Sequence, residues 1–176
     1  MSCPLRKFGF PPGFVVSLSA GRCPLGGRDM LIIRDYEDGD RLPLSILYQS
    51  IRRQEFSWVK KGEATLDEFS RDTKGEAILV ADDDGYPAGF LSIWTPSKFI
   101  HCLYVDRDCR RRGIGSALIE EAGERYGYPL HLKCMDVNEK AKAFYRDSGW
   151  KITQKEQLSY GLCLLMQLDE KTRKRV

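Results

Sequence analysis

The stretch LYVDRDCRRRGIGSAL, residues 103–118, decides the fold expected of this chain. It joins an apolar run that reads as a strand, Phe99–Val105, to a helical pattern that begins at Gly113. Gly113 and Gly115 allow a tight turn and leave consecutive backbone N–H groups at the start of the helix. Such a helix N-terminus can bind phosphate through hydrogen bonds and the helix dipole. The stretch predicts a strand, a tight turn and a helix, with phosphate as a candidate ligand of the turn.

Three consecutive arginines, residues 110–112, stand in that turn and would add charge-assisted donors for a pyrophosphate or a ribose phosphate. Taken by itself, the stretch fits a solvated basic turn equally well, with glycines that only reverse the chain. Two other phosphate motifs do not fit. Leu118 stands where the dinucleotide fingerprint needs its third glycine, and the chain has no Gly-Lys-Ser or Gly-Lys-Thr tripeptide.

A second block, NEKAKAFYRDSGW, follows at residues 138–150. The two blocks occur in order, and each opens a helix after a strand. Arg110-x-x-Gly113-x-Gly115 resembles the acetyl-CoA pyrophosphate loop of the GNAT-type N-acetyltransferase superfamily, and the second block resembles that family's N-x-x-A-x-x-F-Y-x-x-x-G-[FW] motif. The resemblance covers about residues 30–168. Arg107 departs from the family, which often has proline there, and this bears only on the stiffness of the loop.

Hydrophobic periodicity gives the remaining elements. It predicts strands at residues 30–34, 77–81, 89–94, 99–105, 130–135, 150–155 and 160–168. Helices are expected at residues 40–53, after the capping-box sequence Thr65-x-x-Glu68, and at residues 113–126 and 139–148. The order predicts an α/β (α+β) fold with a mixed sheet. The resemblance implies the GNAT fold: a mostly antiparallel sheet of about seven strands, splayed between the fourth and fifth, with about four flanking helices.

The organisation along the chain is one domain with two short ends. Residues 1–29 are rich in Pro, Gly and Ser and read as a flexible extension. Its apolar run Phe14–Leu18 is shorter than the apolar region of a secretory signal. Residues 30–170 are expected to form the acyl-CoA N-acyltransferase domain, and residues 171–176 a basic tail.

The resemblance assigns the cofactor site residue by residue. The main chain next to the loop would pair with the pantetheine arm as an added strand, at Leu103, Tyr104 and Val105. The loop would hold the pyrophosphate through amides and arginines, at Arg110, Arg111, Arg112, Gly113, Ile114, Gly115 and Ser116. Asn138 would hydrogen-bond the pantetheine, and the Tyr145 hydroxyl would lie near the sulfur. The implied co-substrate is acetyl-CoA.

Direct acetyl transfer to an amine needs a deprotonated nucleophile and an acid for the departing thiolate. A phenol of pKa ~10 is an adequate acid for a thiolate of pKa ~8.5, which suits Tyr145. Its helical spacing also fits a core aromatic, and the resemblance favours the acid role. The candidate base is His101, which precedes Leu103 by two positions and should share its face of the sheet. A structural role for His101 is an equal alternative, and His131 is a weaker candidate. An imidazole of pKa ~6.5 suits the task.

Cysteine and histidine counts narrow the chemistry. The six cysteines show no C-x-x-C spacing, which favours reduced thiols in a cytoplasmic protein. Cys102 and Cys109 flank the site, but no basic partner for either is evident, so a thiol intermediate is not expected. With two histidines in the chain, a histidine-rich zinc site is excluded, and no metal is expected.

The composition excludes several partner classes. A net charge of +3 over 176 residues is too small to indicate nucleic acid as the main partner. No apolar run approaches the ~20 residues of a membrane span. Many members of the superfamily dimerise, and the sequence leaves the oligomeric state open.

The acceptor is a small-molecule or peptide amine that the sequence does not identify. Several aromatic residues either line its pocket or belong to the core: Phe56, Trp58, Trp94, Phe99 and Tyr160. The predicted function is N-acetyl transfer from acetyl-CoA to a primary amine by direct attack in a ternary complex. The alternative is a catalytically silent acyl-CoA-binding or sensor domain, which would keep the loop but need no acid or base.

Overall fold

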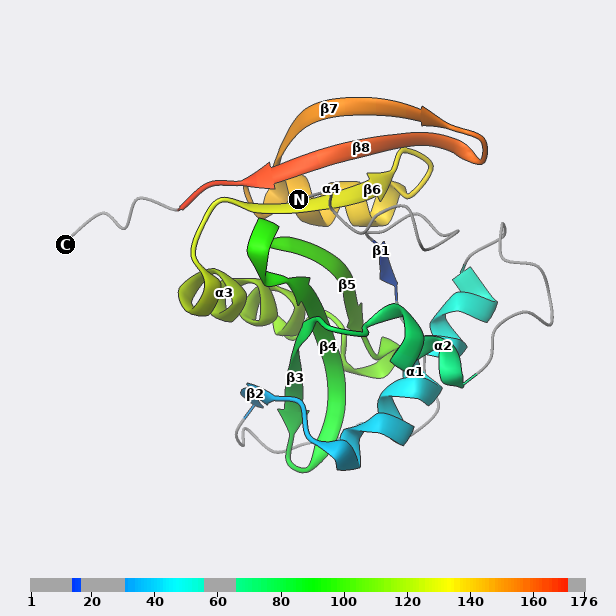
Figure 1. Ribbon diagram of the computed structural model, residues 1–176, viewed down its shortest axis with the longest axis vertical. Coiled ribbons are helices and arrows are strands. Elements are labelled where there is room, and N and C mark those ends of the chain that lie inside the picture. Colours follow the sequence, from blue (N-terminus) through cyan, green and yellow to red (C-terminus); the bar gives the residue numbers. More distant parts are fainter. Residues whose placement is uncertain (1–13, 17–30, 56–65, 171–176) are drawn as a thin grey trace.

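The computed structural model describes residues 14–16, 31–55 and 66–170 (Figure 1). The strands are β1 (Phe14–Val16), β2 (Leu31–Asp35), β3 (Ala77–Asp83), β4 (Tyr86–Trp94), β5 (Phe99–Val105), β6 (Leu130–Met135), β7 (Lys151–Leu158) and β8 (Gly161–Leu168). The helices are α1 (Arg41–Glu55), α2 (Asp67–Asp72), α3 (Ile114–Tyr126) and α4 (Glu139–Asp147). Single 3₁₀ turns occupy Asp38–Asp40, Thr95–Ser97 and Arg107–Cys109.

One mixed sheet contains all the described strands, in the order β2-β3-β4-β5-β6-β8-β7 with β1 beside β5. β5 and β6 are parallel because the chain crosses over through α3 between them. Their pairing ends after two residue pairs, Phe99 with His131 and Ile100 with Leu132. We call the region beyond, where residues 101–105 of β5 no longer pair with β6, the split. The predicted splay between the strands at residues 99–105 and 130–135, which are β5 and β6, is thereby confirmed.

Two apolar clusters cover the two faces of the sheet. Helices α1 and α2 pack over one face, where Leu44 and Phe69 meet Phe90 and Tyr104. Helices α3 and α4 pack over the other face, where Leu118 and Tyr145 join the core. The split therefore lies in the middle of the sheet, between β5 and β6, with helices on both faces (Figure 1).

Most predicted elements are confirmed within a few residues, and three features were not foreseen. Within the expected extension, Phe14–Val16 forms β1, which runs parallel to β5. Helix α2 begins at Asp67 after Leu66, with no side-chain cap, and Thr65 of the expected capping box lies outside the described residues. A bulge in β5 shifts the register between β4 and β5.

Among the described residues, no helix is long and apolar enough to cross a membrane.

Candidate functional site

The loop that follows β5 is held in place by Asp106. Its buried carboxylate accepts hydrogen bonds from the Asp108 N–H at 3.0 Å and from the Tyr86 hydroxyl at 2.6 Å. The Asp106 N–H donates to the carbonyl of Ala88 on β4 at 2.8 Å. These bonds fix the start of the loop to the end of the sheet, so the loop leaves β5 in a defined direction.

Two left-handed residues then turn the chain into α3. Arg111 has φ +60° and Gly113 has φ +80°, and Gly113 is the N-cap of α3 without a side-chain cap. The first N–H groups of α3 have no acceptor within the helix and are oriented for an anion. At Gly115 an added Cβ would lie 3.3 Å from Phe144, so glycine permits the close approach of α3 and α4. Gly113 therefore turns the chain as predicted, whereas Gly115 lies inside α3 and serves packing rather than the turn.

Arg112 differs from its two neighbours. Its guanidinium donates to both carboxylate oxygens of Asp83 on β3, at 2.6 and 2.9 Å. The Asp83 side chain is 4% exposed and that of Arg112 40%. The pair anchors the loop to the β3 end of the sheet. A role for Arg112 toward phosphate stays a prediction, as does that of Arg110 and the exposed Arg111.

Replacing Arg112 with alanine is expected to lower the free energy of unfolding by about 1–2 kcal/mol, because it leaves a buried carboxylate without this partner. Urea unfolding measures the loss. Arg146→Ala is the matched control, because its ion pair with Asp147 is exposed on both sides and should contribute almost nothing. Equal stability of the two variants would contradict the anchoring role of Arg112.

The part of β5 expected to bind the pantetheine arm, residues 103–105, has its side chains in the core. Leu103 and Val105 pack on the α3 face, whereas Tyr104 packs on the α1 face. These residues can therefore offer a ligand their main-chain groups. In this structure β1 takes that position, because Phe14, Val15 and Val16 pair with Cys102, Leu103 and Tyr104. β1 also contacts β6 and α4, which places it in the split.

The two site candidates of residues 138–150, Asn138 and Tyr145, have different environments. Asn138 is the N-cap of α4, and its side-chain oxygen accepts from the Ala141 N–H at 3.1 Å. Tyr145 is 1% exposed, and its ring packs against Phe144 and Trp150. Burial, with smaller effects from nearby thiols, raises the pKa of the Tyr145 phenol well above its ordinary value. The phenol therefore stays protonated throughout the neutral range, and it is a weaker acid than the ordinary phenol assumed from the sequence.

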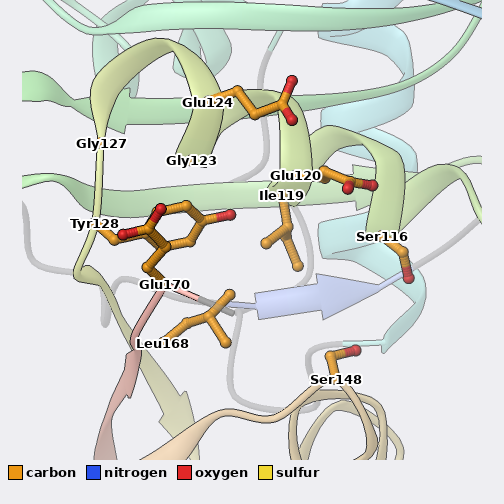
Figure 2. A pocket seen from close by; sticks show the side chains of 10 residues that line it. All are labelled: Ser116, Ile119, Glu120, Gly123, Glu124, Gly127, Tyr128, Ser148, Leu168 and Glu170. Atoms are coloured by element: carbon orange, nitrogen blue, oxygen red, sulfur yellow. The ribbon is translucent and has the colours of Figure 1, made fainter. Parts of the chain in front are cut away.

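A cavity of about 740 Å³ lies beside α3, at the side of the split (Figure 2). It is lined by Ser116 at the start of α3 and by Ser148 at the end of α4, and β1 runs between the two helices in the same view. Its other polar side chains include three carboxylates, Glu120, Glu124 and Glu170. Ser116 adjoins the loop, but Glu120 lies beside it (Figure 2), so the carboxylates that line the cavity would repel a phosphate there.

His101 lies where the split begins. Ser92 of β4 pairs with Cys102 and Ile93 pairs with Ile100, so His101 is the extra residue of a bulge. The bulge interrupts the alternation of β5, which removes the basis for expecting His101 on the face of Leu103. The Nδ1 of His101 contacts Oε1 of Glu76, from the connection between α2 and β3. No motif in the sequence points to Glu76, which is 25 positions from His101.

One of the aromatic acceptor candidates, Phe99, lies near His101. Trp94 and Phe99 are opposite one another on β4 and β5, and the Phe99 ring is 4.9 Å from that of His101. Phe99 also lines a cavity of about 370 Å³ with His131 and Lys133. Burial lowers the pKa of His131. Tyr160 is exposed, and Phe56 and Trp58 lie outside the described residues.

The four described cysteines are buried: Cys102, Cys109, Cys134 and Cys163. Burial, together with the nearby Glu76 carboxylate, raises the pKa of Cys102, and burial raises that of Cys134 to about 12. Buried thiols of this kind are poor nucleophiles at neutral pH. Within the described residues, no three metal-ligating side chains are grouped to hold a metal ion.

Comparison with protein families matches residues 44–150 to the acetyltransferase (GNAT) family. The chain belongs to this family, and it is an acetyl-CoA-dependent N-acetyltransferase. The peptidyl-lysine N-acetyltransferase YjaB of Salmonella typhimurium is 28% identical over 126 residues, which cover 70% of this chain and 83% of that protein.

Solved structures agree on the fold. The ribosomal-protein-alanine N-acetyltransferase of Brucella melitensis has a TM-score of 0.62 at 23% identity and covers 80% of this chain and 100% of its own. The acetyltransferase YncA of Salmonella typhimurium, solved with acetyl-CoA, has a TM-score of 0.61 at 16% identity, with 84% and 98% covered. At these identities the likeness supports the architecture alone.

Proposed function

We propose that this chain transfers the acetyl group of acetyl-CoA to a primary amine of a peptide or protein, with the lysine side chain as the first acceptor to test. One arrangement carries the proposal. The anion-binding start of α3 follows the same strand, β5, whose main chain loses its β6 partner at the split. The activity of YjaB on peptidyl-lysine supports the choice of acceptor.

The cofactor would bind with its pyrophosphate at the first turn of α3 and its arm along β5. The loop offers backbone amides from Arg111 to Ser116, and the arginines add positive charge. The arm would hydrogen-bond to the main chain of Leu103 and Val105, as a strand does. To do so it must take the position of β1 beside Leu103.

The acetyl group would pass directly from sulfur to nitrogen in a ternary complex. His101, at the start of the split, is proposed to take a proton from the acceptor ammonium, and a β5 N–H is proposed to stabilise the oxyanion. Tyr145 is proposed to protonate the departing thiolate. The burial of Cys102 and Cys109 supports direct transfer, since neither thiol is placed to form an acetyl-cysteine.

Acetyl-CoA calorimetry followed by thiol release with a panel of amines tests the proposal. The panel contains lysine peptides, peptide N-termini, polyamines and aminoglycosides. We expect binding, with thiol release on the lysine peptides. Release on another class would reassign the acceptor, and binding without release on any amine would favour the silent acyl-CoA-binding alternative. Failure to bind acetyl-CoA would contradict the site itself.

Replacing His101 with alanine is expected to lower kcat about 100-fold while the Kd for acetyl-CoA stays the same, because the residue acts on the acceptor. Thiol release at saturating acetyl-CoA measures the loss. His131→Ala separates the two histidines, and a larger loss in that variant would move the base to β6.

The setting proposed for this activity is the cytoplasm. Acetyl-CoA is the donor, and four cysteines are buried in the fold, where reduced thiols act as small apolar residues. The catalytic domain is proposed to span residues 30–170.

A further inference from the structure

Glu76 holds a buried carboxylate against the candidate base. The residue lies between α2 and β3, and its N–H donates to the Thr73 carbonyl at 3.0 Å. The Glu76 side chain is 6% exposed and that of His101 15%, and the contact joins Oε1 to Nδ1. The second carboxylate oxygen, Oε2, is buried and has no hydrogen-bond partner in the described part of the chain. An isolated carboxylate in such a place costs several kcal/mol, so its partner matters.

The neighbouring buried charges form ion pairs with one another instead. Arg52 on α1 pairs with Asp72 at 2.9 Å and lies 3.6 Å from Glu68. The Tyr48 hydroxyl donates to the same Asp72 carboxylate at 2.7 Å. The ion pair found for Glu76 among the described residues is the one with His101. Among the described residues, the Glu76 carboxylate is therefore paired with an imidazole ring rather than with a permanently charged lysine or arginine.

The bulge in β5 determines where the Glu76–His101 pair lies. It sets His101 apart from the regular ladder of β4 and β5, directly after Ile100, the last β5 residue that pairs with β6. A side chain here lies at the closed end of the split, where the proposed cofactor arm would end. Bulges commonly re-aim a side chain beside an active site.

We propose that Glu76 is a positioning residue that fixes His101 in the tautomer able to accept the substrate's proton, an inference that rests on the proposed function. With Nδ1–H donated to the carboxylate, the lone pair of the ring is on Nε2. The acceptor ammonium gives one proton to Nε2, and the free amine attacks the thioester carbonyl. The C–S bond breaks, and the thiolate takes the Tyr145 proton. The attacking nitrogen gives up its second proton as the amide forms, and this proton restores the Tyr145 phenol. Glu76 stays ionised and stabilises the imidazolium until solvent removes its proton.

Two substitutions separate charge from shape. Glu76→Gln keeps the length of the side chain and loses the charge, whereas Glu76→Asp keeps the charge and shortens the side chain. We expect Glu76→Gln to lower kcat on the order of 10-fold to 100-fold, the range typical of groups that orient a functional histidine, with the Kd for acetyl-CoA unchanged. Glu76→Asp should retain more activity than Glu76→Gln. A packing role predicts the reverse order, and that result would overturn the proposal.

The ring itself provides a readout that needs no turnover. The chain has two histidines, so ¹⁵N spectra of histidine-labelled protein give two sets of ring signals, and His131→Gln identifies those of His101. We expect the Nδ1–H tautomer in the unmodified chain and a shift away from it in Glu76→Gln. An unchanged tautomer would overturn the proposal. If the unmodified chain fails to bind acetyl-CoA, the proposed function fails, and the spectra still decide whether Glu76 orients His101.

Discussion

Gly113→Asp should weaken acetyl-CoA binding by 100-fold or more. Gly113 is the N-cap of α3, and apart from its chain neighbours no atom lies within 4 Å of a Cβ built there, so a carboxylate has room beside the proposed pyrophosphate site. Two like charges about 4–5 Å apart repel by about 3–4 kcal/mol at an effective dielectric constant of about 20. Calorimetric titration with acetyl-CoA measures the loss.

Two control variants isolate the charge. Gly113→Ala introduces a Cβ at the same φ of +80° without a carboxylate, and it should bind far better than Gly113→Asp. Gly85→Asp places the same carboxylate at the same φ of +80° in the turn between β3 and β4, and its affinity should match that of the unmodified chain. Undiminished affinity in Gly113→Asp would move the pyrophosphate away from this loop.

Tyr145→Phe should lower kcat by about 100-fold or more and leave acetyl-CoA affinity nearly unchanged. The buried phenol keeps its proton at neutral pH, and the substitution removes that proton while keeping the ring against Phe144 and Trp150. Protonating the thiolate then falls to water, which is not held in place. Thiol release under saturating acetyl-CoA measures kcat.

The control for Tyr145→Phe is Tyr126→Phe at the end of α3. The Tyr126 phenol is partly buried, and burial also raises its pKa, but it is not part of the proposed site. Its removal should leave kcat within about twofold. If Tyr145→Phe retained the kcat of the unmodified chain, Tyr145 would be a core aromatic, the alternative that its helical spacing allows.

The sequence was sufficient for the features with a long, regular pattern. The strand, loop and helix at residues 99–126 and the later crossover through α4 follow from periodicity and glycine placement, and the crossover implies a parallel pair of strands. That this pair splits was implied by the resemblance to the GNAT family. The bulge at His101 could not be foreseen, because an extra residue in a ladder leaves no trace in the alternation of apolar residues.

Contacts between residues far apart in the chain could not be predicted from the sequence either. Glu76 and His101 are 25 positions apart, and Asp83 and Arg112 are 29 apart, so only the folded sheet brings each pair together. β1 has three residues in a segment rich in Pro and Gly, too few to establish a period of two. The position of β1 depends on the stretch of β5 that does not pair with β6, and this stretch is a property of the sheet rather than of residues 14–16.

Splitting a sheet in its middle creates two inner edges, and strand edges attract any main chain that can pair with them. On β5, residues 14–16 occupy that edge in this structure. Under the proposed function, β5 therefore exchanges β1 for the arm of acetyl-CoA, and the cofactor does not bind to an empty strand edge. Its measured Kd is the intrinsic value divided by the fraction of molecules in which β1 has left, so the N-terminal strand sets the acetyl-CoA concentration at which the enzyme works.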